Sequence, residues 1–157
     1  MSGHVVLTLT RIEATHLAEL LGQFAELVGS SPAIPDPALE RLTPDVYPED
    51  AEASREFRSL TRSDLLRRRA DDARVVLDGL AAIEQDEDEL APVEVSVDAV
   101  QLRAWMRTLA AVRLVIADRL GIVDDDEDRD PDDPRYGVYD WLGYRLELLV
   151  QTAERGF

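Results

Sequence analysis

The chain carries one local pattern twice: a short β-prone run, a helix N-cap and an amphipathic helix. The first copy runs from Val5–Leu9 into Thr10–Glu13, and the second runs from Val93–Val97 into Asp98–Gln101. In each copy a Thr or Asp precedes a Glu or Gln by three residues, which is the spacing of a capping box. Short strands are stable only with a partner strand and a helical cover. We therefore expect the two strands to pair with each other.

The two copies can be overlaid at an offset of 88 residues, which places Leu7 on Val95 and Leu17 on Trp105. One interpretation is duplication, in which the strands pair about a pseudo-twofold axis. The other is that any strand followed by a capped amphipathic helix aligns in this way. The sequence leaves both interpretations open.

The rest of the chain has helical spacing of apolar residues, interrupted by prolines and charged loops. Predicted helices run from Thr10 to about Val28, over Ala38–Leu42, over Glu49–Arg58, from a Thr61 cap to about Ile83, from Asp98 to Leu120 with Gly121 closing it, and over Tyr136–Glu154. We predict a mainly α (α+β) fold with about four to six helices and a small two-stranded sheet. Its length fits one domain of residues 1–157.

Acidic residues outnumber basic ones by 33 to 17, which gives a formal net charge of −16. Residues 84–89 contribute −5 and residues 124–133 contribute −7, so most of the excess lies in two segments. We expect acidic loops near 84–91 and 122–135 on a body that is nearly balanced in charge. Nucleic-acid affinity comes largely from clustered positive charge. Because this chain is strongly acidic, we do not expect it to bind nucleic acid directly.

Most kinds of catalytic, cofactor and metal site lack the residues that they need. The absence of cysteine and lysine excludes thiolate metal sites, disulfides and lysine catalysts. No glycine pattern fits a phosphate-binding loop. An EF-hand starting at Asp124 would need Gly and Glu where Arg129 and Arg135 stand, which leaves only weak divalent-ion binding open. His4 and His16 are expected on the surface. We predict no enzyme, no catalytic residue, no cofactor and no metal.

No stretch approaches the roughly 18 apolar residues of a membrane helix. The first residues also lack the long apolar run of a signal peptide. We therefore expect a cytoplasmic protein with no membrane association.

The only basic cluster lies in the Arg62–Arg74 region, where aspartates interleave with arginines. Arg68–Asp72 and Arg74–Asp78 have the i, i+4 spacing of helix ion pairs, and such interleaving is typical of a salt-bridged solvent face. Two other interpretations stay open for this region: contact with DNA, and docking of an acidic protein surface.

The last predicted helix is apolar around most of its circumference, which is typical of a central helix or of a helix that pairs with another chain. One stripe comprises Val138, Leu142, Leu146, Leu149 and Ala153. A second stripe beside it comprises Trp141, Tyr144 and Leu148. The second stripe is the candidate for a dimer or partner interface, since aromatic residues are enriched in interfaces.

Several short motifs, in this order, resemble an actinobacterial family known as domain of unknown function 2017. They are Pro44–Pro48, Glu56–Thr61, Arg113–Val115, Arg119–Gly121 and Val138–Gly143, of which the last is the most specific. The family includes an oxidation-sensing regulator, which implies a regulatory role. That type of member is thought to use a cysteine pair and to act with an extracytoplasmic-function-type sigma factor. This chain has no cysteine, so direct thiol sensing does not carry over.

We therefore expect a non-enzymatic, cytoplasmic regulatory protein that binds a protein partner, such as a sigma factor or another regulator, and forms a homodimer. Its role would be in stress-response transcriptional regulation. The candidate interaction surface comprises Arg113, Trp141, Tyr144 and Leu148. The alternative is a transcription regulator that contacts DNA through Arg62–Arg74.

Overall fold

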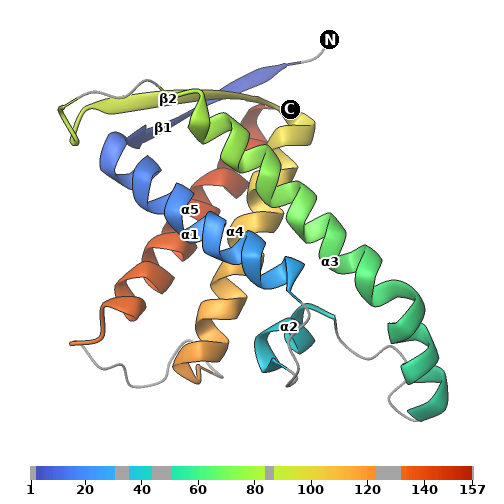
Figure 1. Ribbon diagram of the computed structural model, residues 1–157. Helices are drawn as coiled ribbons and strands as arrows, with labels where there is room; N and C mark the ends of the chain where they lie inside the picture. The colour runs from blue at the N-terminus through green and yellow to red at the C-terminus, as the bar shows by residue number, and fades with distance from the viewer. Residues whose placement is uncertain (1–2, 31–35, 44–50, 84–86, 123–131, 157) are drawn as a thin grey trace.

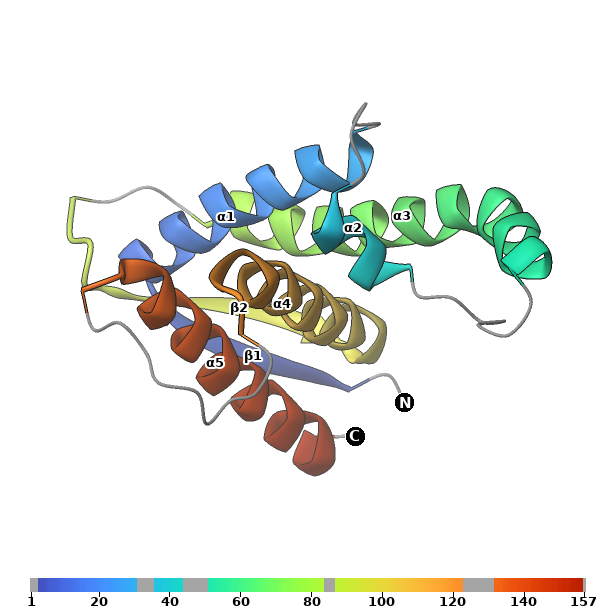
Figure 2. The ribbon, with the colours of Figure 1, turned by 90° about the horizontal axis from the view of Figure 1, so that it is seen from below.

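The computed structural model describes residues 3–30, 36–43, 51–83, 87–122 and 132–156, with the backbone alone for 51–60 (Figure 1). The elements follow the order β1 (His4–Thr10), α1 (Arg11–Gly29), α2 (Pro37–Leu42), α3 (Ala51–Ala81), β2 (Pro92–Asp98), α4 (Ala99–Leu120) and α5 (Pro134–Gly156). The two strands form a layer across one end of a helical layer, as Figures 1 and 2 show. These elements confirm the predicted mainly α fold with a small sheet.

The two strands pair with each other, as predicted, and they run antiparallel. The register sets Leu7 opposite Val95 and Thr10 opposite Pro92. Alternate residues point toward the helices, so that Leu7, Leu9, Val93, Val95 and Val97 are buried. The residues that the proposed duplication makes equivalent, Leu7 and Val95, face each other directly. A pseudo-twofold axis requires this arrangement, although the duplication itself stays a hypothesis.

Both predicted capping boxes form where the strands turn into helices. At α1, the Glu13 amide donates to Thr10 Oγ1 (3.2 Å) and the Thr10 amide donates to Glu13 Oε1 (3.1 Å). At α4, the Gln101 amide donates to Asp98 Oδ1 (2.7 Å) and the Asp98 amide donates to Gln101 Oε1 (2.8 Å). Each box satisfies two amides that a helix start leaves without partners, which fixes the turn from sheet to helix.

Residues 51–81 form one continuous helix, α3, so the predicted break between Arg58 and Thr61 was wrong. The sequence signal was Thr61 as an N-cap with Asp64 three residues later. Thr is only a few tenths of a kcal/mol poorer than the best residues inside a helix. No proline or glycine interrupts the chain between Ala51 and Asp78, so nothing forces a second helix start.

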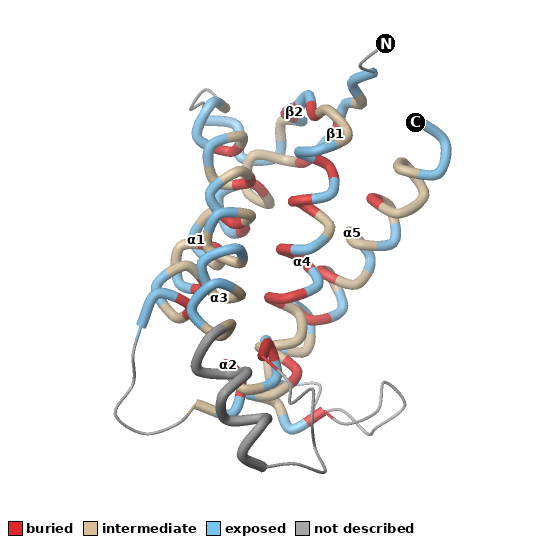
Figure 3. Tube along the Cα trace, turned by 90° about the vertical axis from the view of Figure 1, so that its right-hand side faces the viewer, coloured by how far each residue is buried: buried red, intermediate tan, exposed pale blue. Residues whose placement is uncertain are grey.

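The core lies between the sheet and the helices, where α1, α3, α4 and α5 converge (Figure 3). Its most buried large side chains include Leu17, Leu21, Leu102, Leu109 and Leu142. In α5 the first predicted stripe supplies Leu142 and Leu149 to this core, while Tyr144 of the second stripe stays exposed. Among the described residues, no helix combines the length and apolar character that crossing a membrane requires.

Candidate functional site

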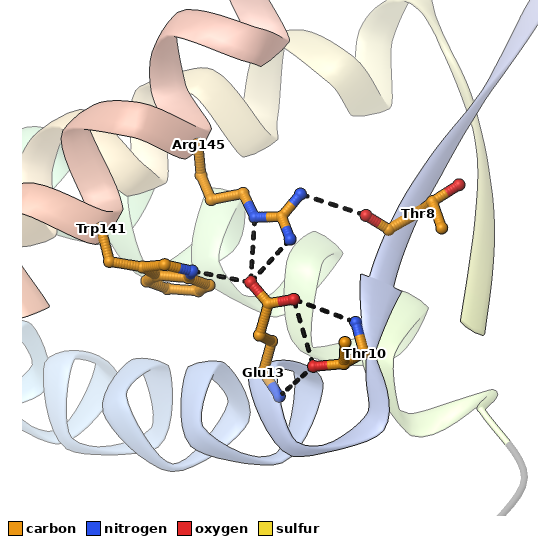
Figure 4. A network of polar contacts seen from close by, with 5 residues as sticks. All are labelled: Thr8, Thr10, Glu13, Trp141 and Arg145. Atoms are coloured by element: carbon orange, nitrogen blue, oxygen red, sulfur yellow. Dashed lines mark hydrogen bonds and ion pairs between the residues drawn. The ribbon is translucent and has the colours of Figure 1, made fainter. Parts of the chain in front are cut away.

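The Glu13 carboxylate joins β1, α1 and α5 (Figure 4). Its Oε1 completes the capping box with Thr10. Its Oε2 accepts from Trp141 Nε1 (2.7 Å) and from the Arg145 guanidinium (2.6 Å to NH2 and 3.2 Å to Nε). Arg145 also donates from NH1 to the Thr8 carbonyl (3.1 Å), so one α5 side chain holds both the strand and the helix that follows it.

This environment keeps Glu13 charged. Burial raises the pKa of its carboxyl. Hydrogen bonds from Arg145, Thr10 and Trp141 outweigh that effect and lower the pKa from 4.5 to about 2. The side chains of Arg145 and Glu13 are only 20% and 23% exposed, so their ion pair is less screened than a typical surface pair.

A second contact fixes α5 to α4. The Arg113 guanidinium lies over the Tyr139 ring, 3.8 Å from its centroid, and Arg113 Nε donates to the Tyr139 carbonyl (3.2 Å). Gly143, one turn later on α5, leaves the space that the guanidinium fills, because a Cβ there would lie 2.9 Å from Arg113 Nε. The motif Val138–Gly143 therefore contributes three residues to internal contacts: Tyr139 and Gly143 to Arg113, and Trp141 to Glu13.

The four predicted surface residues separate into two pairs. Arg113 and Trp141 are half-buried and hold α5 in place. Tyr144 is 61% exposed, and Leu148 lines an open groove. Sequence reasoning missed Arg145 altogether. Its only local signal is its position one helical turn after Trp141, which places both side chains on the same face of α5.

The groove beside Leu148 has a volume of about 250 Å³ and lies between β1 and α5. Val6, Thr8 and Leu9 line it from the strand, and Leu148 and Thr152 from the helix. Other lining residues are Leu7, Leu17, Trp105, Leu109, Trp141, Arg145 and Leu149. Its walls are mostly apolar, and Val6 on its strand side is 54% exposed. An open apolar groove of this kind is suited to binding an apolar group.

The expected ion pairs within α3 are absent among the described side chains. Asp72 instead accepts two hydrogen bonds of 2.9 Å from Arg107 on α4, a bidentate contact stronger than a single i, i+4 pair. Arg67 pairs with Asp64 at 3.6 Å. In the described part of the chain, Arg62, Arg68, Arg69 and Arg74 form no ion pair.

No cluster of three or more potential metal ligands occurs in the described ranges. The acidic segment at 124–131, where weak ion binding was considered, lies outside them, as do residues 84–86. His4 and His16 are exposed, as predicted.

A family model for a domain of unknown function (DUF2017) matches residues 1–153. The chain belongs to the DUF2017 family. No curated protein and no solved structure matches it. The DUF2017 match covers both strand–helix units and most of α5, so it includes the Glu13 and Arg113 contacts.

The low pKa of Glu13 makes the stability of this DUF2017 chain depend on pH. Above pH 4.5 the carboxylate is charged in both folded and unfolded chains, and its stabilisation is complete. As the pH falls from 4.5 toward 2, the unfolded chain takes up the proton first, and the free energy of unfolding decreases by about 1–2 kcal/mol.

We expect Glu13→Gln to lower the free energy of unfolding at pH 7 and to reduce the decrease of this free energy on acidification, measured by urea unfolding. Asp36 titrates in the same range, with a pKa of about 2, so the informative quantity is the difference between variant and wild type. The exposed Glu26→Gln is the control; an equal effect of both variants would contradict the assignment.

Gly143→Ala tests the contact between α5 and α4. The new Cβ would lie 2.9 Å from Arg113 Nε, and the guanidinium cannot move without losing its contact with Tyr139. We expect a loss of about 1–3 kcal/mol in thermal unfolding. Gly137→Ala is a matched control in the same helix, with no atom within 4 Å of its Cβ. It should be neutral or stabilising by up to about 1 kcal/mol. Equal stability changes in the two variants would refute the tight packing at Gly143.

Proposed function

We propose that this protein is a non-enzymatic, cytoplasmic regulator that acts by binding a protein partner through the surface formed by Tyr144 and Leu148. The observation that carries the proposal is the exposed aromatic ring of Tyr144 on α5, the helix whose Leu148 lines an apolar groove. Large exposed apolar side chains beside a groove are typical of protein interaction sites, in which aromatic anchors supply much of the binding energy.

Two carboxylates, Glu13 and Asp36, are not suited to general acid–base catalysis. A general acid or base works best with a pKa near the working pH. Glu13 and Asp36 both have a pKa of about 2, because arginine side chains hold each of them in the charged form. These carboxylates therefore stabilise the fold and do not exchange protons near neutral pH.

The family resemblance supports a regulatory role in the stress response, with a sigma factor or another regulator as partner. Because the chain has no cysteine, the signal would reach this protein through its partner and not through a thiol of its own. A homodimer through the second α5 stripe stays a prediction.

The absence of cysteine allows a precise test of the interaction surface. A single Tyr144→Cys carries a photo-crosslinker at the proposed site, and Val100→Cys, at a position that is 65% exposed on α4, carries it elsewhere. We expect a partner from the native host to crosslink at residue 144 and not at residue 100. The purified partner should then bind Leu148→Glu about tenfold or more weakly than wild type, because a charge in the groove costs desolvation. Identical crosslinking from both positions would reject the surface.

A second candidate function is DNA contact through Arg62–Arg74. The observation that favours it is that Arg62, Arg68, Arg69 and Arg74 form no ion pair among the described side chains, which leaves their charge available to phosphates.

DNA contact would give a mobility shift at low salt that weakens steeply as salt rises, because phosphate binding releases counterions. Arg68→Ala with Arg74→Ala should then weaken binding and flatten the salt dependence. Arg103→Ala with Arg155→Ala, at exposed arginines on α4 and α5, is the charge-matched control. If the wild type gives no shift even at low salt, DNA contact is excluded.

A further inference from the structure

The outer edge of β1 has main-chain groups that the sheet does not use. Arg11 and Ala91 continue the strand register and share a hydrogen bond (3.0 Å). Hydrogen-bonded and non-hydrogen-bonded residue pairs alternate along an antiparallel ladder. Because Arg11 and Ala91 form a hydrogen-bonded pair, Val6 and Thr8 belong to non-hydrogen-bonded pairs. Their amides and carbonyls therefore point away from β2. The Arg145 bond to the Thr8 carbonyl agrees with this direction. Among the described residues, nothing outside the sheet bonds to the main chain of Val6.

The two edges of the sheet differ in how they are protected. The β2 edge begins with Pro92, which has no amide to donate, and also presents Glu94. Proline and charged side chains are common means of preventing a further strand from adding to an edge. The strand His4–Thr10 has no proline and no acidic, Lys or Arg residue. The open edge is therefore the β1 edge.

Helix α5 forms a wall beside that edge. Arg145 meets Thr8, and a Cβ at Gly156 would lie 2.6 Å from Val5 Cγ1, so α5 follows the strand over several residues. Figure 3 shows α5 on the β1 side of the molecule, away from β2. An extended segment added to β1 would point alternate side chains toward Leu148 and Thr152 in the groove.

The position of α5 favours a single extended segment over a second folded copy of this chain. In a symmetric pairing of two β1 strands, each copy would bring its own α5 beside the other's β1. Packed helices need about 8–10 Å between their axes, and adjacent strands lie only about 4.8 Å apart. Two α5 helices would therefore compete for the same space, whereas a segment without a helix would not.

The net charge of the protein indicates the charge of the partner. The chain as a whole has a net charge of −16. The field of this charge attracts a segment with Lys or Arg residues and repels an acidic one.

We propose that the groove between β1 and α5 binds an extended, net-basic segment of a partner protein, which adds to β1 as a third strand. The main chain of Val6 and the Thr8 amide provide the hydrogen bonds, and apolar side chains of the segment enter the groove beside Leu148. This is the strand-addition mode of peptide recognition. The inference rests on the proposed function and specifies the chemistry of the partner at the same surface.

The test uses the full chain and a display library of random linear peptides. Selected peptides should have apolar residues at alternate positions and should carry Lys or Arg. They should slow hydrogen exchange at the Val6 and Thr8 amides of the wild-type protein. Val6→Pro should weaken their binding about tenfold or more, because it removes the outward amide. Ser96→Pro is the matched control, because Ser96 is the cross-strand partner of Val6 and loses an amide on the opposite edge.

Three results would overturn the inference: no selected peptides, exchange protection located elsewhere, or equal losses in Val6→Pro and Ser96→Pro. A wild-type dimer in light scattering that Val6→Pro converts to monomer would also overturn it, in favour of a second copy at this edge. The outcome is separable from the proposed function. If the partner that crosslinks at residue 144 binds Val6→Pro as tightly as wild type, strand addition fails and the interaction surface stands.

Discussion

The Glu13 carboxylate is the contact on which the arrangement of β1, α1 and α5 depends. One of its oxygens closes the capping box at the start of α1, and the other accepts three hydrogen bonds from α5. A partly buried charge is tolerated only when its hydrogen-bonding capacity is used. Arg145 extends the contact to the Thr8 carbonyl, so the same pair also fixes the distance between the helix and the strand edge.

The two strand–helix units differ at this point. Among the described residues, the box at α4, Asp98 with Gln101, is exposed and bonds only within itself. The box at α1 instead uses an ionised Glu13 to hold a third element. If the units arose by duplication, the attachment of α5 is what makes them unequal. The attachment of α5 also explains why a groove forms beside β1, because Glu13 and Arg145 hold α5 next to this strand.

Sequence patterns predicted the local structure and the pairing of the two strands, but missed the side-chain contacts between residues that are distant in the sequence. Alternation revealed both strands, spacing revealed both capping boxes, and Gly121 closes α4 with a φ of 71° as its position suggested. The continuity of α3 was missed because a cap signal at Thr61 competes with helix propensity, and only the complete fold decides between them. The pair Glu13–Arg145 joins residues 132 positions apart, and no local pattern specifies such a contact.

The motif Val138–Gly143 shows why a specific sequence signature need not mark a binding surface. Its most distinctive residues hold α5 against α4 and α1, so the wall of the groove is in position without a partner. A pre-positioned wall lowers the entropy lost on binding, which strengthens an interaction of modest size. The residues proposed for partner contact, Tyr144 and Leu148, are those at neighbouring helical positions. The proposed binding role of α5 therefore follows from the same helical period that separates the residues facing Glu13 and Arg113 from those facing outward.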